Sequence, residues 1–403
     1  MTIKKAPRAV IIGAGVAGPV TAMALRKAGI EVTVHEAYDY AADGVGAFLT
    51  VAVNGQRALH ELDLLPILAG QGFDCPRFEF FTGKGRRLGG FASAPPREDT
   101  LTSRTITRAD LYRALRDEAL RRGVTIEYGH RLTDAYATAG GVTAVFDDGT
   151  TADGDLLIGA DGLLSATRRL VDPKAPKPRY IPLLNTGGWA AADRAPDVGG
   201  EVGTMAMYFG RDAFYCHMKA PDGTLWWFAN VPQVRELSAA ELRQITDEQW
   251  RRRLLEAFAA DTTPATAVIA ATDTIVRPWN TYDFPTVPKW HTDRMVLVGD
   301  AAHAASPTSG QGASLAIEDA LTLAKCLRDR PDPATAFVAY ERLRRRRVEK
   351  IVADAKRRSS DKMPGPIGRT LRDLVFPLVL ARAGRASQDQ VLDHRIHWAE
   401  PVR

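Results

Sequence analysis

The sequence has few cysteines and no spacing typical of a disulfide framework or a metal centre. Its 403 residues include three cysteines, Cys75, Cys216 and Cys326, which lie far apart along the chain. An odd number of isolated cysteines, without a CxxC pair or a Cys/His spacing, argues against disulfide bonds and zinc. We therefore expect no metal and a reducing, cytoplasmic environment.

Long apolar runs are also missing. The best candidate for a membrane span, residues 374–380, is far too short to cross a bilayer and contains Pro377. The N-terminal residues 1–7 are polar and lack the apolar centre of a secretory signal. We expect neither a membrane span nor a secretion signal.

Charge of one sign is not concentrated enough to indicate a nucleic-acid-binding protein. The net charge is +5, with 25% charged and 45% hydrophobic residues, which is ordinary for a globular chain with a large core. A moderate positive excess suits small anionic ligands such as a pyrophosphate. The densest basic cluster, residues 342–347, falls in a helical stretch, where we expect a solvated face or pairing with carboxylates. We expect no nucleic-acid partner.

What the sequence does contain is a strand, a glycine-rich turn and a helix at its start. The apolar run 9–12 predicts a buried parallel strand, and the helical pattern that follows stops at Gly29. Residues 30–35 predict a second strand, which ends at Glu36. The turn between strand and helix reads Gly13-Ala14-Gly15-Val16-Ala17-Gly18. This βαβ unit, with a GxGxxG turn and an acidic residue about twenty positions later, predicts a dinucleotide site.

Each motif residue of this unit has a physical role in that prediction. Gly13 permits the tight turn, Gly15 lets the backbone approach a pyrophosphate, and Gly18 lets the helix pack closely on the strand. The helix N-terminus presents free N–H groups to the anion. Glu36 can accept hydrogen bonds from ribose hydroxyl groups.

A second glycine-bearing segment occurs much later in the chain. Residues 294–300 predict a buried strand that ends at Gly299-Asp300, and a long helix is expected from about residue 313 to 328. Between them lies Pro307-Thr308-Ser309-Gly310-Gln311-Gly312. A chain that leaves a dinucleotide site and returns to close over the same cofactor indicates FAD, whereas an NAD-only dehydrogenase gives no account of the return. Backbone N–H groups and the helix dipole at this point would stabilise negative charge on a reduced flavin.

The first half of the chain is otherwise expected to be largely cofactor domain. Residues 107–120 predict a helix, and residues 124–128 and 142–146 predict strands. A further buried strand leads into Gly159-Ala160-Asp161-Gly162. Residues 73–103, rich in aromatic residues, glycine and proline, are expected to interrupt this domain as a β excursion.

Helical periodicity weakens and aromatic residues concentrate between residues 174 and 285. Three stretches, 205–209, 213–218 and 225–229, predict successive antiparallel strands joined by turns. A sheet with this much aromatic area suits an apolar, aromatic ligand pocket, and ordinary sheet core is the alternative reading. The candidate substrate contacts are Met207, Phe214, His217 and Trp227.

Three motifs follow one another along the chain: residues 13–18 with Glu36, residues 159–162, and Gly299-Asp300 with residues 307–312. In this order they resemble the motifs of the class A FAD-dependent aromatic hydroxylases, the para-hydroxybenzoate hydroxylase-like flavoprotein monooxygenases. The chain is similar to their shorter members, which include tetracycline-inactivating and natural-product tailoring enzymes. The resemblance implies an α/β fold: a Rossmann-like FAD-binding domain with an inserted, mainly antiparallel β-sheet substrate domain and C-terminal helices. The expected divisions are 1–72, 104–173 and 286–345 for the discontinuous FAD domain, 73–103 and 174–285 for the substrate domain, and 346–403 for the C-terminal helical segment.

The resemblance also implies a role for individual residues. Arg108 would reach back to the cofactor, Leu132 would lie near the adenine, and Asp300 would bind the ribityl chain. His303 is expected to make structural hydrogen bonds, and no protein residue is expected to be catalytic because the flavin performs the chemistry. The implied cofactor contacts are Gly13, Gly15, Ala17, Gly18, Glu36, Ala47, Arg108, Leu132, Asp161, Gly299, Asp300, Pro307, Gly310 and Gly312.

The activity implied by the resemblance is that of an FAD monooxygenase. NADPH or NADH would reduce the flavin, and O2 would then form a flavin C4a-hydroperoxide that inserts one oxygen into an aromatic or polycyclic small molecule. The alternatives are epoxidation, Baeyer–Villiger insertion or an oxidase or reductase reaction on the same fold, and a flavin-binding protein without turnover. The sequence leaves the oligomeric state open.

Overall fold

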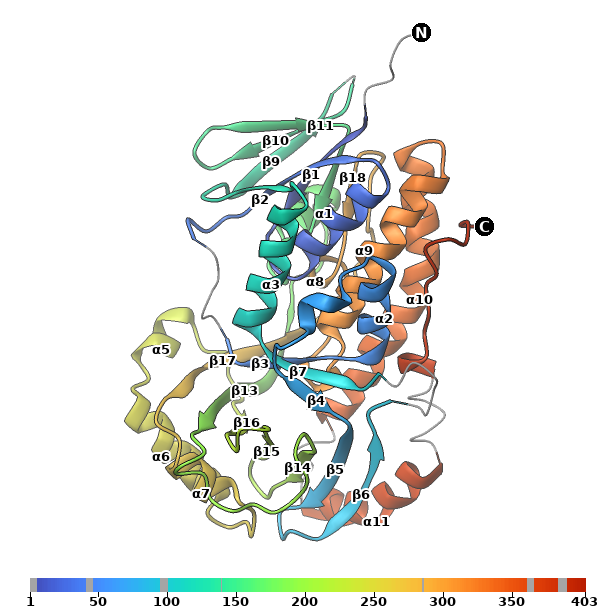
Figure 1. The fold of residues 1–403 in the computed structure, drawn as a ribbon. Helices are drawn as coiled ribbons and strands as arrows, with labels where there is room; N and C mark the ends of the chain where they lie inside the picture. The colour runs from blue at the N-terminus through green and yellow to red at the C-terminus, as the bar shows by residue number, and fades with distance from the viewer. Residues whose placement is uncertain are drawn as a thin grey trace.

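The computed structural model of the chain describes residues 6–40, 46–94, 101–138, 140–284, 286–360, 366–382 and 390–403. Residues 1–5 of the polar N-terminus and residues 95–100 of the expected β excursion lie outside this part. The molecule is elongated, with an α/β layer in its upper part and a large, mainly antiparallel sheet in its lower part (Figure 1). The α/β architecture predicted from the sequence is confirmed.

A parallel five-stranded sheet forms the centre of the α/β layer. Its strand order is β18-β12-β1-β2-β8, so the strand of the late segment enters the same sheet as the N-terminal βαβ unit. Its central strands β12 and β1 and the edge strand β18 are short, mostly buried apolar runs, as strands covered on both faces require, whereas the other edge strand, β8, is polar and partly exposed. The strands are β1 (Arg8–Ile12), β2 (Glu31–His35), β8 (Thr125–Glu127), β12 (Leu156–Gly159) and β18 (Met295–Leu297).

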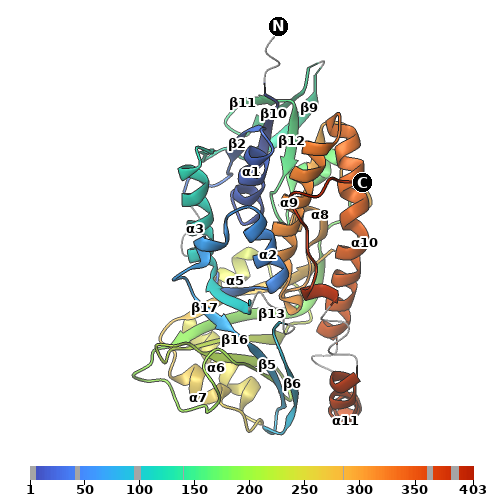
Figure 2. The ribbon, with the colours of Figure 1, turned by 45° about the vertical axis from the view of Figure 1, so that its right-hand side comes forward.

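Helices cover this sheet, and α9 packs against both α1 and α10 beside it (Figure 2). Helix α9 is buried along most of its length because α1, α2 and α10 all contact it. These helices are α1 (Ala17–Lys27), α2 (Val53–Glu61), α3 (Arg108–Arg121), α4 (Ala166–Val171), α8 (Asp300–His303), α9 (Gly312–Asp329) and α10 (Pro333–Ser360), with the 3-10 turns η1 (Leu65–Leu68) and η2 (Pro307–Ser309).

Two three-stranded antiparallel sheets accompany the main layer. The first, in the order β11-β10-β9, contains the strand expected at residues 142–146 and forms a separate layer above the main sheet (Figure 1). The second, in the order β3-β7-β4, lies between the α/β layer and the large sheet. The strands are β9 (Leu132–Ala137), β10 (Val142–Phe146), β11 (Thr151–Gly154), β3 (Phe48–Val51), β4 (Phe73–Cys75) and β7 (Ser103–Thr107).

The large sheet has seven strands in the order β17-β13-β16-β15-β14-β5-β6. All its neighbouring pairs are antiparallel except β14 with β5, so the three strands expected between residues 205 and 229 pair as predicted. The strands are β5 (Arg77–Thr82), β6 (Arg87–Ala92), β13 (Arg179–Ala190), β14 (Met205–Phe209), β15 (Phe214–Lys219), β16 (Leu225–Pro232) and β17 (Ile275–Asp283).

Helices α6 and α7 cover one face of the large sheet, and helix α11 covers the β5–β6 end of its opposite face. Trp250 of α6 donates its indole N–H to Thr186 of β13, and Trp227 of β16 donates to Thr272, which follows α7. Helix α11 instead contacts β6, and its Phe376 ring lies 5.3 Å from the Phe80 ring of β5. The helices are α5 (Ala239–Gln244), α6 (Asp247–Phe258), α7 (Ala265–Ala270) and α11 (Pro366–Arg382).

The basic run at residues 342–347 lies within α10, which continues without a break through residue 346. Arg344 is buried and paired with Glu318 and Asp319 of α9. Arg345 pairs with carboxylates on its own helix, and Arg347 pairs with Glu318. Three of the arginines are therefore matched with carboxylates. Among the described helices, none is long and apolar enough to cross a membrane.

Candidate functional site

Two of the three glycines in the first turn are required by close backbone contacts. Gly13 has φ +101°, and a Cβ there would lie 2.6 Å from the carbonyl oxygen of Ala160, at the end of the neighbouring strand β12. A Cβ at Gly18 would collide with the carbonyl oxygen of Gly13. Gly13 therefore forms the turn, and Gly18 lets α1 pack against it.

Gly15 has a different environment. No atom lies within 4 Å of a Cβ built on it, so its backbone borders open space. Helix α1 begins next to this space, and its N-terminal cap residue Val16 makes no side-chain hydrogen bond to the first turn. Uncapped N–H groups beside an open backbone are the donor set that a pyrophosphate needs.

Glu36 closes the turn from the end of β2. Its Oε2 accepts a hydrogen bond of 2.7 Å from the amide of Ala14, and its Oε1 accepts one of 3.1 Å from the amide of Tyr38. A carboxylate offers about four acceptor positions, so these bonds leave capacity for ribose hydroxyl groups. Glu36 thus holds the glycine turn while remaining able to bind a ligand.

Asp161 has a carboxylate that is engaged within its own loop. Its oxygens accept hydrogen bonds from the Ser165 hydroxyl and from the amide and hydroxyl of Thr167, at the start of α4. Its backbone borders the first turn, since a Cβ at Gly13 would lie 3.0 Å from the Cα of Asp161. The structure therefore brings Asp161 to the site through its backbone.

The late segment reaches the same place from the other side. Gly299 has φ +59°, and a Cβ there would lie 3.3 Å from the Cβ of Ala17 on α1 and 3.1 Å from that of Ala316 on α9. The turn after β18 therefore packs between the two helices that begin at the two glycine motifs. The structure brings together Ala17 and Gly299, which are far apart in the sequence.

Asp300 lies deep in the molecule and is nevertheless accessible. Desolvation by the surrounding protein raises the pKa of this carboxyl above its ordinary value, although the side chain is solvent-exposed. A carboxyl that is both exposed and desolvated is expected at the wall of a recess, and we call the space bordered by Gly15, Asp300 and Gly310 the hollow. Its Oδ1 lies 3.9 Å from a Cβ position on Gly312, the first residue of α9. Helix α9 has no side-chain N-cap, and a Cβ on Gly310 would meet no atom within 4 Å.

Arg108 and Ala47 lie on the wall next to Asp300. The amide of Arg108 donates a 3.0 Å hydrogen bond to the carbonyl of Ala47, and the Arg108 side chain packs on Gly46, whose φ is +87°. The positive charge of Arg108 acts on Asp300 and partly offsets the rise in its pKa. Pro307 begins η2 between Asp300 and α9, whereas Leu132 is buried at the start of β9, in the small sheet above the main layer.

Sequence reasoning missed the buried ionic cluster that fixes the late segment. Asp319 of α9 accepts hydrogen bonds from the Gly299 amide, from Arg344 and at 2.5 Å from His303. Burial alone would raise the pKa of Asp319, but the charges of His303 and Arg344 outweigh it and hold the pKa below its ordinary value. His303 makes the structural hydrogen bond expected of it. A run of basic residues at helical spacing was the available signal for Arg344.

Asn54 extends this cluster to α2. Its Nδ2 donates to Gln311 Oε1 at 3.0 Å and to Glu318 Oε1 at 2.7 Å, and all three side chains are buried. Gln311 immediately precedes α9, so the hydrogen bond fixes the end of the second glycine motif against α2. No motif in the sequence indicated Asn54.

The four candidate substrate residues do not share one face of the large sheet. Met207 and Phe214 lie on the face that packs with Phe48 of β3. Trp227 lies on the face covered by the helices, as its bond to Thr272 shows, and His217 is its register partner on β15. Burial lowers the pKa of His217 to about 4. The structure therefore separates His217 and Trp227 from Met207 and Phe214 by the thickness of the sheet.

The residues around this hollow fit FAD. Gly15 and Gly310 leave open space where a Cβ would intrude, and α1 and α9 both begin there without side-chain caps. Glu36, from the first glycine segment, and Asp300, from the second, supply carboxylate acceptors for hydroxyl groups. Two uncapped helix N-termini with two carboxylates match a ligand that carries a pyrophosphate, two sugar-like chains and a ring that becomes negative on reduction.

Comparisons with known proteins agree with this geometry. The FAD binding domain family matches residues 7–355. The chain is 33% identical over 358 residues to an FAD-dependent urate hydroxylase of Klebsiella pneumoniae, covering 87% of this chain and 89% of the relative. It is 31% identical over 389 residues to the 3-amino-4-hydroxybenzoate 2-monooxygenase PtnB3 of Streptomyces platensis, covering 92% of each. The crystal structure of Klebsiella pneumoniae HpxO with FAD and uric acid is similar with a TM-score of 0.83, 27% identity and 96% coverage of both chains.

A Rossmann-like sheet joined by a returning strand, with two glycine turns on one hollow, defines an FAD-dependent oxidoreductase. The chain belongs to the FAD binding domain family, and it is an FAD-dependent monooxygenase like the hydroxylases to which it is similar. The family resemblance, the FAD cofactor and the enzyme class predicted from the sequence are confirmed.

Proposed function

We propose that this monooxygenase uses NADPH or NADH and O2 to hydroxylate a largely apolar aromatic small molecule. The observation that carries the proposal is the chemistry of the sheet face that packs with Phe48. On β14, β15 and β16 this face carries aromatic and sulfur-containing side chains and no charged ones. These side chains are Met205, Met207, Phe209, Phe214, Cys216, Met218, Trp226 and Phe228.

This face lies beside the proposed FAD site. The ring of Phe48 lies 5.5 Å from that of Trp226 and 6.0 Å from that of Phe228. A Cβ on Gly187 of β13 would lie 3.6 Å from the Cβ of Ala47, which precedes Phe48. Because Trp226, Phe228 and Phe48 are only partly buried, their rings retain surface available to a ligand. Met207 and Phe214 on this face remain proposed substrate contacts.

The polar groups on this face are neutral. Asn230 of β16 is the register partner of Phe214, and its Nδ2 donates to Asn185 Oδ1 at 2.6 Å. Asn185 in turn donates to the Thr281 hydroxyl at 2.7 Å. The guanidinium of Arg372 on α11 lies over the Phe209 ring, 4.6 Å from its centroid, at the end of this face formed by β14. Strands β14, β15 and β16 themselves offer no charged side chain on this face, so a charged ligand beside Phe48 would lose solvation without an opposite charge from them. The wall beside Phe48 therefore favours neutral aromatic rings with few polar substituents. The urate and aminohydroxybenzoate acted on by the relatives are more polar.

The contribution of the chain to the reaction is positioning and electrostatics. Bound FAD supplies hydride acceptance from the nicotinamide and activation of O2. The N–H groups at the start of α9 and the guanidinium of Arg108 would stabilise negative charge at the flavin end of the hollow. The apolar sheet face would exclude water from the reacting ring. Glu36 and the amides around Gly15 would hold the adenosine and pyrophosphate end.

The division of the chain into domains is also part of the proposal. All strands of the parallel sheet come from residues 1–72, 104–173 and 286–345, and all strands of the large sheet come from 73–103 and 174–285. The two sheets have separate hydrophobic cores, which supports an FAD-binding part and a substrate part. The third division at residue 346 falls inside α10, so the C-terminal part begins within a helix that packs on α9.

The test is a turnover screen of the FAD-loaded protein against two sets of aromatic compounds, one neutral and apolar and one anionic. NADPH and NADH oxidation would be followed by absorbance, and products by mass spectrometry under ¹⁸O₂. The expected result is one labelled oxygen in a neutral aromatic product. Turnover restricted to anionic heterocycles, or nicotinamide oxidation without a labelled product from any compound, would contradict the proposal.

A further inference from the structure

Two histidines and a glutamate meet at the carboxyl ends of β2 and β8, beside Glu36, and none of the three is among the expected FAD contacts. His35 and Glu127 are the last residues of β2 and β8, which pair in parallel with these two residues in register. The chain then turns at Gly129, with φ +77°, and brings His130 back over them. The amide of His130 donates to the carbonyl of Glu36 at 2.8 Å, which fixes this return.

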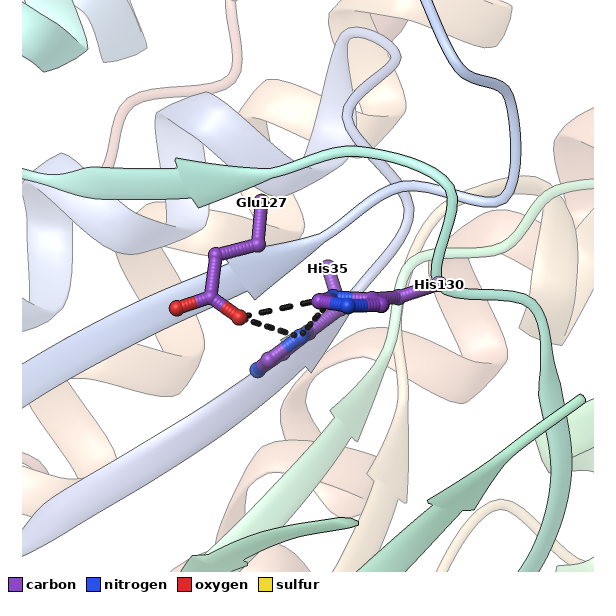
Figure 3. Close-up of side chains that lie close together, drawn as sticks. All are labelled: His35, Glu127 and His130. Carbon is purple, nitrogen blue, oxygen red and sulfur yellow. Dashed lines mark hydrogen bonds and ion pairs between the residues drawn. The ribbon is translucent and has the colours of Figure 1, made fainter. Parts of the chain in front are cut away.

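Each of the three side chains directs one possible metal-ligand atom toward a common point (Figure 3). His35 Nδ1 lies 3.2 Å from His130 Nδ1, and Glu127 Oε2 lies 3.4 Å from each of them. Tetrahedral zinc, with nitrogen and oxygen ligands at about 2.0–2.1 Å, requires neighbouring ligand atoms to be about 3.3 Å apart. The observed triangle has these edges.

Hydrogen bonding accounts poorly for the same triangle. One bond between the two imidazole nitrogens is feasible at 3.2 Å. The two distances of 3.4 Å to the carboxylate exceed the usual range for an N–H···O bond. A shared cation satisfies all three edges at once.

The surroundings of the cluster hold both rings in place. The ring of Phe146 on β10 stacks on His35 at 4.6 Å and on His130 at 5.0 Å. The carboxylate of Asp148 lies 3.6 Å from the second nitrogen of His130, Nε2. At this distance Asp148 makes no hydrogen bond to the ring, but it lies on the far side of His130, where a carboxylate that moves closer would fix a zinc-ligating ring and increase its basicity.

We propose that His35, Glu127 and His130 form a zinc-binding site, with water as the fourth ligand. His35 is buried, whereas the side chain of Glu127 is 44% exposed, so the site opens to solvent on the glutamate side. Two imidazoles and a carboxylate suit zinc better than magnesium or calcium, which prefer oxygen ligands. The bound ion would join the ends of β2 and β8 and fix the backbone just before Glu36, the residue that closes the glycine turn.

The proposal does not depend on the proposed function, and it differs from the expectation of no metal drawn from the sequence. The test is a titration of the FAD-loaded full chain with zinc chloride after removal of any affinity tag. Binding would be measured by calorimetry and by metal analysis after dialysis. We expect one zinc per chain in the wild type. His130→Ala and Glu127→Gln should each lower the affinity at least tenfold.

A matched control is His60→Ala, because His60 is exposed on α2 and lies outside the cluster. This variant should bind zinc as the wild type does. Cobalt(II) should give intense ligand-field absorption typical of tetrahedral coordination in the wild type and in His60→Ala only. Zinc should also raise the melting temperature of the wild type and of His60→Ala, but not that of His130→Ala or Glu127→Gln. Absence of saturable zinc binding by the wild type, or affinity equal to wild type in either Glu127→Gln or a folded His130→Ala, would overturn the proposal.

Discussion

The amide of Gly299 donates a hydrogen bond of 2.9 Å to Oδ2 of Asp319, a side chain with no solvent exposure. This bond joins the turn after β18 to the middle of α9. Asp319 also pairs with Arg344 of α10, so one buried carboxylate connects the second glycine segment to two long helices. Asp300 directly follows Gly299, so its position depends on the buried carboxylate of Asp319.

Asp319→Asn should destabilise the protein and weaken FAD binding together. Arg344 keeps Glu318 as a partner, but Glu318 is shared with Arg347, so the variant leaves an excess of buried positive charge. Breaking a buried ion pair in this way costs about 3–5 kcal/mol. Urea unfolding should give a lower free energy of unfolding by that amount, and the purified variant should carry less flavin. Asp117→Asn is the control, because Asp117 pairs with Arg116 at the surface and is 58% exposed. A loss below 1 kcal/mol in Asp319→Asn, equal to that of the control, would contradict the role of Asp319.

Acid should destabilise the fold through Glu318. Burial would raise the pKa of Glu318, but the charges of Arg344 and Arg347 outweigh burial and lower it from 4.5 to about 2. In the unfolded chain the group takes up a proton near its ordinary pKa, whereas in the folded chain it stays ionised to about pH 2. Its contribution to stability is therefore complete above pH 4.5 and is lost as the pH falls from 4.5 toward 2.

The measurement is urea unfolding between pH 6 and pH 3, compared with Glu318→Gln. The wild type should lose stability steadily in the acid part of this range. The variant should start less stable and show a shallower dependence on pH. Equal slopes for the two proteins would be inconsistent with a depressed pKa at Glu318.

Asp300→Ala should reduce FAD retention while the fold stays largely intact. The side chain is exposed to the hollow, so its removal opens no gap in the core. Loss of one hydrogen bond to a charged acceptor costs about 1.5–3 kcal/mol, which corresponds to about a ten- to hundredfold weaker affinity. Fluorescence titration of the apoprotein with FAD measures this change. Asp293→Ala, at an exposed position upstream of β18, is the control. Unchanged affinity in Asp300→Ala would remove Asp300 from the site.

Phe228→Ala should weaken binding of the aromatic substrate. Phe228 is partly buried on the sheet face that packs with Phe48, so its truncation removes apolar contact area beside the ligand. We expect KM for a neutral aromatic substrate to rise about tenfold with a smaller change in kcat, since about 1.5 kcal/mol of apolar contact is lost.

Tyr215→Phe is the control for that experiment, because Tyr215 is buried on the opposite face. Its hydroxyl has no hydrogen-bond partner among the described residues, so its removal should leave both KM and stability close to those of the wild type. An equal rise in KM for the two variants would show that the faces of the sheet do not differ in their contact with substrate.

The order of the glycine motifs was enough to predict the fold class and the cofactor, because each motif has a local physical cause. Gly13 has a positive φ, and a side chain at Gly18 would collide with the carbonyl of Gly13. Both requirements arise within six residues of sequence, so the motif alone predicts the local structure. The placement of Phe214 and His217 on opposite faces was also readable, because an odd separation along a strand reverses the face.

Other features depend on packing between elements distant in sequence. The burial of Arg344 follows from the way α10 lies against α9, and nothing in a run of arginines tells which one turns inward. The approach of His35 to Glu127 requires β2 and β8 to be neighbours in register. Spacing rules for metal ligands apply to short segments, so they gave no indication of this cluster.

The central claim is that the open backbone at Gly15 and the hollow beside Asp300 hold a single FAD. The most direct measurement is titration of the apoprotein with FAD for the wild type and Gly15→Ala. A Cβ at Gly15 would meet no protein atom within 4 Å, so the variant should fold normally and still lose affinity by tenfold or more because the methyl group occupies pyrophosphate space. We predict one FAD per wild-type chain and this loss in the variant. A wild type that folds without saturable FAD binding, or a variant with unchanged affinity, would contradict the account.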